Sequence, residues 1–180
     1  MASPAPRVAV RGEILHFLAD PALAAPACEH YADGLLVIAN GRVVQTGAAD
    51  AVLAALPPGT PVTDYRGKLV LPGFVDTHIH YPQTDVIASY GEQLLPWLER
   101  YTFPAEARFA DPSHARTVAG FFLDELLANG TTTAAIYATV HPDSVDAILE
   151  AAAARNMRIA AGKVMMDRNA PANLRDTAQS

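Results

Sequence analysis

Short apolar runs separated by turn-forming residues occupy the first third of the sequence. Four of these runs have the length and composition of β-strands: residues 8–15, 35–39, 42–46 and 61–65. Asn40-Gly41 separates the second run from the third, and this dipeptide favours the type I′ turn of a hairpin because both residues readily adopt positive φ. A short helix is predicted over residues 50–56, since Pro57-Pro58-Gly59 ends it. The pattern therefore predicts a small β domain over residues 1–66.

From residue 67 onward, continuous apolar runs alternate with amphipathic stretches, which is the pattern of βα units in a parallel sheet. The predicted strands are residues 69–80, 131–139 and 157–166. The predicted helices cover residues 93–101, the stretch from a Ser113 cap to Asn129-Gly130, residues 142–155, and a segment that opens at residues 169–171. The predicted fold class is α/β, with about three βα units over residues 67–180.

Composition excludes several classes of protein. Of the 180 residues, 51% are hydrophobic and 18% are charged, which is typical of a globular chain. The formal charge of −6 gives no general electrostatic reason to bind nucleic acid, and the longest purely apolar runs are far shorter than the ~20 residues that cross a bilayer. The single cysteine, Cys28, cannot form an internal disulfide, and the N-terminus lacks the pattern of a secretion signal. We therefore expect a reducing, cytoplasmic setting, with no nucleic-acid or membrane partner.

The sharpest chemical feature is His78-Ile79-His80, at the end of the first predicted parallel strand. Side chains alternate along a strand, so both imidazoles leave the same face, with Cα atoms roughly 6.6 Å apart. The carboxyl ends of parallel strands are where α/β folds build their sites, and two imidazoles there can bind one zinc ion. An isolated pair of this kind is more often incidental, and two histidines are an incomplete zinc shell. Asp76 has the same phase, and it either orients a ligand or forms a purely structural hydrogen bond.

Residues 72–80 resemble the first metal-binding motif of the amidohydrolase superfamily. Four further blocks are similar to the guanine deaminase family within it: residues 80–83, 97–106, 129–134 and 162–167. The resemblance implies a (β/α)8 TIM-type barrel preceded by a small β-sandwich, and zinc-dependent hydrolysis of guanine to xanthine and ammonia. Residues 1–66 are then the β-sandwich segment, and residues 67–180 are an incomplete barrel.

The resemblance also implies roles for individual residues. His78 and His80 match the first two ligands of a single zinc ion, and Gln83 matches the glutamine that recognises the guanine edge. The alternative for Gln83 is an amide in a solvent-facing loop. The family's aspartate ligand and proton-shuttling glutamate are expected beyond Ser180, so we assign no catalytic residue within the chain. Members of the family commonly form homodimers.

Several alternatives stay open. Trp97, Tyr101 and Phe103 are expected to serve packing rather than to cover a site, and the roles of His141 and Asp167 are undecided between loop structure and the site. The chain is interpreted as the N-terminal portion of a longer enzyme or a truncated product, inactive alone. The competing hypotheses are an amidohydrolase that acts on another amino- or halogen-substituted heterocycle, and a non-catalytic remnant with a binding or assembly role.

Overall fold

The computed structural model describes residues 6–177. Contacts divide the chain into an N-terminal unit, Met1–Pro72, and a C-terminal unit, Gly73–Ser180. The sequence pattern placed the boundary after residue 66, but the last strand of the N-terminal unit continues through Val70 and pairs there with Ile14. Among the described residues, no helix is long and apolar enough to span a membrane.

The N-terminal unit is a four-stranded sheet with one short helix. Its elements are β1 (Arg7–Phe17), β2 (Cys28–Ala39), β3 (Arg42–Ala48), α1 (Ala49–Ala55) and β4 (Val62–Val70). The strand order is β3-β2-β1-β4, in which β2 runs antiparallel to both of its neighbours and β4 runs parallel to β1. The predicted hairpin is confirmed, because Asn40 and Gly41 both have positive φ between β2 and β3. A small core of Ala9, Leu35, Val37, Ala49 and Val52 joins the sheet to α1.

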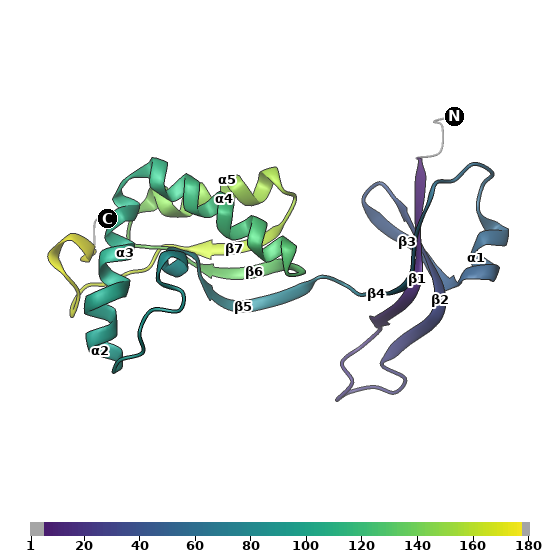
Figure 1. The fold of residues 1–180 in the computed structure, drawn as a ribbon, viewed down its shortest axis with the longest axis horizontal. Coiled ribbons are helices and arrows are strands. Elements are labelled where there is room, and N and C mark those ends of the chain that lie inside the picture. The colour runs from purple at the N-terminus through teal and green to yellow at the C-terminus, as the bar shows by residue number, and fades with distance from the viewer. Residues whose placement is uncertain (1–5, 178–180) are drawn as a thin grey trace. The chain divides into compact units, whose positions relative to one another are not determined.

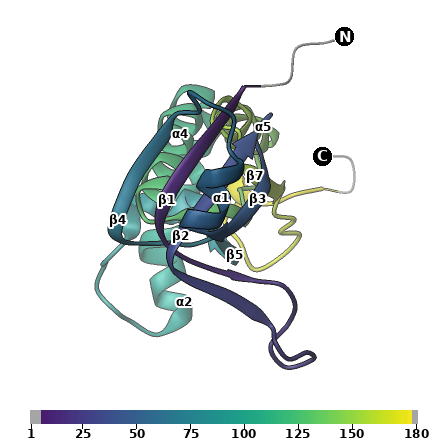
Figure 2. The same ribbon diagram turned by 90° about the vertical axis from the view of Figure 1, so that its right-hand side faces the viewer.

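The first two strands are longer than their apolar runs predict. Figure 2 shows the β1–β2 ribbon continuing as a long hairpin beyond the other strands, and its pairing ends at Phe17 and Cys28. Polar side chains pair across this ribbon: Arg11 donates to Asp33 at 2.8 Å, and the imidazoles of His16 and His30 lie 3.0 and 2.9 Å from the carboxylates of Glu29 and Glu13. Cross-strand pairs of opposite charge stabilise such a ribbon.

The C-terminal unit contains a three-stranded parallel sheet with the order β5-β6-β7. Its strands are β5 (Phe74–His80), β6 (Thr131–Tyr137) and β7 (Arg158–Gly162), and its longer helices are α4 (Pro112–Ala128) and α5 (Pro142–Ala154). Figure 1 shows α4 and α5 side by side on one face of this sheet. The core between them includes Tyr81, Phe122, Leu123, Ile136 and Ile148.

A chain of short helical turns connects β5 to α4 and carries the residues of interest. These turns are η1 (Tyr81–Val86), α2 (Leu94–Trp97), η2 (Leu98–Thr102), α3 (Phe103–Ala107) and η3 (Arg108–Ala110). The helix predicted over residues 93–101 thus continues to Ala110. Pro104 lacks an N–H and would interrupt a regular α-helix. The π-helical turn η2 lies directly before α3, which contains Pro104, and accommodates this break in the regular hydrogen-bond pattern.

Three other element predictions differ from the structure. Residues 69–80 are not one strand, because Pro72-Gly73 separates β4 from β5. The cap of α4 is Asp111 rather than Ser113, since its carboxylate accepts the Ser113 backbone N–H at 2.8 Å. No α-helix follows residues 169–171; the described chain forms only the 3-10 turn η4 (Ala172–Leu174) there.

Candidate functional site

The two histidine rings at the end of β5 converge. The Nε2 atoms of His78 and His80 lie 3.2 Å apart. Two nitrogens bound to one tetrahedral zinc ion at 2.0–2.1 Å are separated by about 3.3 Å, so the observed spacing fits joint coordination of one ion. Within residues 6–177, no group of three or more His, Cys, Asp or Glu side chains is close enough to hold a metal ion. The described residues therefore bring together two candidate ligand atoms and no third one.

Asp76 shapes the strand that carries these histidines. Its carboxylate accepts the backbone N–H of His78 at 2.9 Å. The ladder between β5 and β6 is irregular between Asp76 and Ile79, so this side chain provides an acceptor where strand pairing is interrupted. This bond is the structural hydrogen-bonding role that the sequence left open for Asp76, and its other role, the orientation of a ligand, stays a prediction.

Tyr137 was not anticipated from the sequence. It ends β6 and pairs in register with His80. Its ring centroid lies 4.7 Å from that of His80, with the two planes only 10° apart, and 4.7 Å from that of His78. The position of Tyr137 at the carboxyl end of the adjacent parallel strand is the signal that could have identified it.

Burial and charge both act on His80. Burial lowers the pKa of its imidazole, and the neighbouring His78 lowers it further. These effects favour the neutral ring, which is the form that donates a lone pair to a metal ion.

The predicted site residues meet in one cavity of about 440 Å³. His78, His80 and Gln83 all line it, and they come from the end of β5 and the following turn η1. Trp97 also lines this cavity, and its indole N–H donates to Ser89 Oγ at 3.0 Å. Phe103 lines a different cavity, so the aromatic residues of this segment do not share one role.

Glu106 is the second residue that sequence reasoning missed. It lies on α3 and is only 6% exposed. Burial raises the pKa of its carboxyl to about 7, and a hydrogen bond with the side chain of Gln83 opposes that shift. Glu106 ends the block of residues 97–106 that carries the family resemblance, but its burial and its partner required coordinates.

The two undecided residues lie outside the cavity lining. His141 precedes α5, where its backbone N–H donates to Thr139 Oγ1 at 3.2 Å and its carbonyl accepts from Ser144 Oγ at 2.7 Å. Among the described residues its buried Nε2 has no hydrogen-bond partner, and burial lowers the pKa of the ring. The Asp167 side chain is 86% exposed and lies 3.8 Å from the Arg168 guanidinium.

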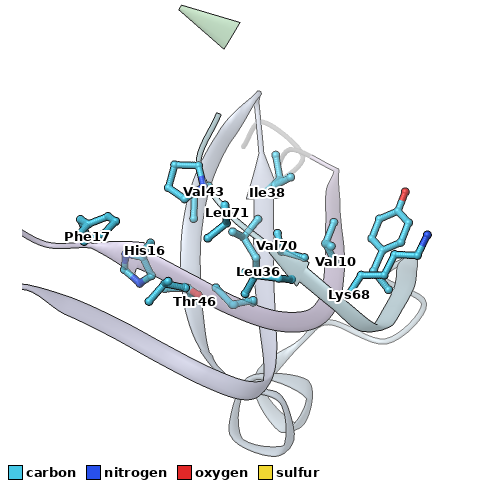
Figure 3. A pocket seen from close by; sticks show the side chains of 15 residues that line it. Val10, His16, Phe17, Leu36, Ile38, Val43, Thr46, Lys68, Val70 and Leu71 are labelled. Atoms are coloured by element: carbon cyan, nitrogen blue, oxygen red, sulfur yellow. The ribbon is translucent and has the colours of Figure 1, made fainter. Parts of the chain in front are cut away.

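A separate cavity of about 770 Å³ lies on the sheet of the N-terminal unit. Figure 3 shows that most labelled side chains around it are apolar, such as Val10, Leu36 and Leu71. His16 is among the lining residues, and its imidazole lies 3.0 Å from the carboxylate of Glu29. The cavity is thus an apolar surface rather than a cluster of reactive groups.

The parallel βα sheet and its converging histidines are features of an amidohydrolase, and the chain belongs to that family: residues 69–180 match the Amidohydrolase family. The chain is 52% identical over 175 residues to a guanine deaminase of Escherichia coli (strain K12), an alignment that covers 96% of this chain and 40% of that protein. It is also similar to a crystal structure of guanine deaminase from Bradyrhizobium japonicum, with a TM-score of 0.90 and 39% identity over 97% of this chain and 38% of that one. A guanine deaminase from C. acetobutylicum, solved with guanine in its active site, has a TM-score of 0.78 and 29% identity, covering 94% of this chain and 39% of that one. The chain thus spans about two fifths of the length of these relatives.

Proposed function

We propose that this chain is the N-terminal portion of a zinc-dependent guanine deaminase, which converts guanine to xanthine and ammonia. The observation that carries the proposal is the convergence of His78, His80 and Gln83 on one cavity, in a chain 52% identical to a guanine deaminase. The bound guanine in a relative of 29% identity supports the same substrate class.

The proposed architecture is the start of a (β/α)8 barrel together with a β-sandwich segment. The parallel order β5-β6-β7, with helices between the strands, supports the barrel. The apolar cavity on the four-stranded sheet supports the sandwich, because a second sheet would cover such a face. A cytoplasmic setting and a homodimer of the full-length enzyme stay predictions.

His78 and His80 are the proposed metal ligands within this chain. Amidohydrolases are generally metal-dependent, and the 3.2 Å separation of the two Nε2 atoms suits neighbouring ligands of one ion. When bound, zinc acts as a Lewis acid and lowers the pKa of water toward neutrality. Tyr137 stacks on His80 and holds its ring in the ligating orientation.

Gln83 is the proposed substrate-binding residue. A carboxamide donates and accepts hydrogen bonds at once, so it matches a purine edge that also carries both groups. Gln83 lines the same cavity as the two histidines, which allows one ring to meet the metal and the amide together.

The test compares variants of the full-length enzyme by metal analysis and by ammonia release from a panel of purines and triazines. We expect zinc and guanine turnover in the wild type, loss of both in His80→Ala, and retained zinc with a raised KM in Gln83→Ala. His30→Ala, an exposed histidine paired with Glu13, is the matched control and should change neither. Turnover of another ring but not of guanine would mean that this other ring is the substrate. Absence of zinc and of all turnover would favour the non-catalytic remnant.

A further inference from the structure

A strained turn lies in the wall of the proposed substrate cavity. Ala88 has a φ of 63°, in the left-handed region, where a Cβ atom is sterically unfavourable. The other non-glycine residues with positive φ among residues 6–177 are all asparagines, whose short polar side chains tolerate this conformation. Ala88 and the flanking Ile87 and Ser89 line the cavity together with His78 and His80.

The backbone identifies a type II turn over residues 86–89. Ile87 has a φ of −55° and a ψ of 132°, Ala88 follows with its positive φ, and the Ser89 N–H donates to the Val86 carbonyl at 3.0 Å. The third position of a type II turn favours glycine, because φ must be positive there. Alanine is therefore a poor residue for this position, and the turn persists only if surrounding contacts hold it.

Trp97 supplies a contact directly beside the strained residue. Its indole N–H donates to Ser89 Oγ at 3.0 Å, and both of these side chains line the cavity. Trp97 follows the turn by eight residues, at the end of α2, so the bond fastens the loop between η1 and α2 back onto the helical segment.

Two further contacts of this loop lie at the surface. Asp85 pairs with Arg108 and Glu92 pairs with Arg100, and the two guanidinium side chains are 57% and 64% exposed. Solvent screens such pairs, so each contributes little to stability. Tyr90, the residue after the turn, is 75% exposed and gains little from burial. A loop held in this way opens at a low cost in free energy, and the bond from the indole is consequently important for its position.

We propose that Trp97 is a positioning residue, which holds the turn of residues 86–89 in place as a fixed wall of the purine cavity. The inference rests on the proposed function and deepens it. Without the bond to Ser89, the strained turn leaves its position in a fraction of the molecules, and a purine that needs this wall binds only to the remainder. The apparent affinity then falls by that fraction, whereas the chemistry of the bound purine is unchanged.

The experiment measures kcat and KM for guanine in the full-length, zinc-loaded enzyme. Trp97→Phe keeps an aromatic ring but removes the N–H donor, and Ser89→Ala removes the acceptor but keeps the indole. We expect each variant to raise KM about fivefold, with kcat within about twofold of wild type. Tyr90→Phe is the matched control, because it removes an exposed hydroxyl next to Ser89, and it should change neither constant.

Two double variants separate positioning from direct contact between the indole and the purine. Glycine adopts positive φ without strain, so Ala88→Gly in the Trp97→Phe enzyme should lower KM again by at least twofold. No recovery would mean that Trp97 acts on the purine itself, and the positioning role would fail. In the same background, Ser89→Ala should have no further effect, and additive effects of the two substitutions would contradict the proposal.

Unchanged KM in folded Trp97→Phe and Ser89→Ala enzymes would also overturn the proposal, even if Tm fell. If the wild-type enzyme releases no ammonia from guanine, the proposed function itself fails, and chymotrypsin cleavage after Tyr90 then tests the turn alone. Faster cleavage there in Trp97→Phe and in Ser89→Ala than in wild type would support the role of the bond, and equal rates would contradict it.

Discussion

Burial shifts the pKa values of two side chains near the site so that each favours its neutral form. It raises the pKa of Glu106 and lowers that of His80, so each group is shifted toward its neutral form. Of these two groups only His80 lines the cavity, and there its neutral ring is favoured.

The buried carboxyl of Glu106 predicts a pH dependence of stability. Its pKa is raised from 4.5 to about 7, so the folded state binds this proton more tightly than the unfolded state does. The resulting stability is fully present below about pH 4.5 and is lost as the pH rises through 7, with an upper limit of about 3 kcal/mol. Urea unfolding of the full-length wild type and Glu106→Gln between pH 5 and pH 8 measures the effect. The free energy of unfolding of wild type minus that of the variant should fall as pH rises, and a difference that is constant with pH would contradict the assignment.

At the scale of elements, a close approach of backbones fixes the start of the parallel sheet. Gly73 precedes β5, and a Cβ atom built on it would lie 2.1 Å from Oγ1 and 2.7 Å from Cβ of Thr132 in β6. Rotation of the threonine side chain moves Oγ1 but leaves its Cβ in place. The glycine is therefore needed for β5 to begin beside β6, and β5 in turn ends at His80.

Gly73→Ala should consequently destabilise the full-length protein by about 1–3 kcal/mol through this steric conflict. Gly162→Ala is the matched control, because it also lies in the parallel sheet but, its chain neighbours aside, no atom of residues 6–177 lies within 4 Å of the Cβ position. The midpoint of thermal unfolding should fall for Gly73→Ala and stay near wild type for Gly162→Ala. Equal shifts in the two variants would mean that the loss of glycine flexibility, rather than contact with Thr132, governs the response.

The elements that the sequence predicted well are those with strong local signals. Asn40-Gly41 determines its own turn, and the spacing of apolar residues predicts α4 and α5 closely. The convergence of His78 and His80 also follows from strand alternation alone. Residues such as Glu106 and Tyr137 needed coordinates, because a hydrogen bond to Gln83 and a ring stacked on His80 depend on how separate elements pack.

At the scale of the whole molecule, apolar side chains remain uncovered in the part of the chain that the structure describes. Phe74 and Val75 at the start of β5 are 57% and 64% exposed, and Met165, after β7, is 82% exposed. The sheet of the N-terminal unit carries an apolar cavity of about 770 Å³. Apolar surfaces of this kind are usually covered in a complete domain, which agrees with a chain that spans about 40% of its E. coli relative.

If the chain is the N-terminal portion of the enzyme, as proposed above, the 180 residues carry only part of a zinc site. Two imidazoles supply only half of a tetrahedral shell, and much of the binding free energy of a zinc site comes from the remaining ligands and their partners. We expect this chain to bind zinc at least 100-fold more weakly than the full-length enzyme, a difference of about 2.7 kcal/mol. Competition with a chromogenic chelator measures both affinities, and His78→Ala in each protein reports whether the measured ion occupies this site. Tight one-to-one binding by the 180-residue chain that His78→Ala abolishes would show that further ligands lie within the chain, and the proposal that the missing ligands follow Ser180 would then fail.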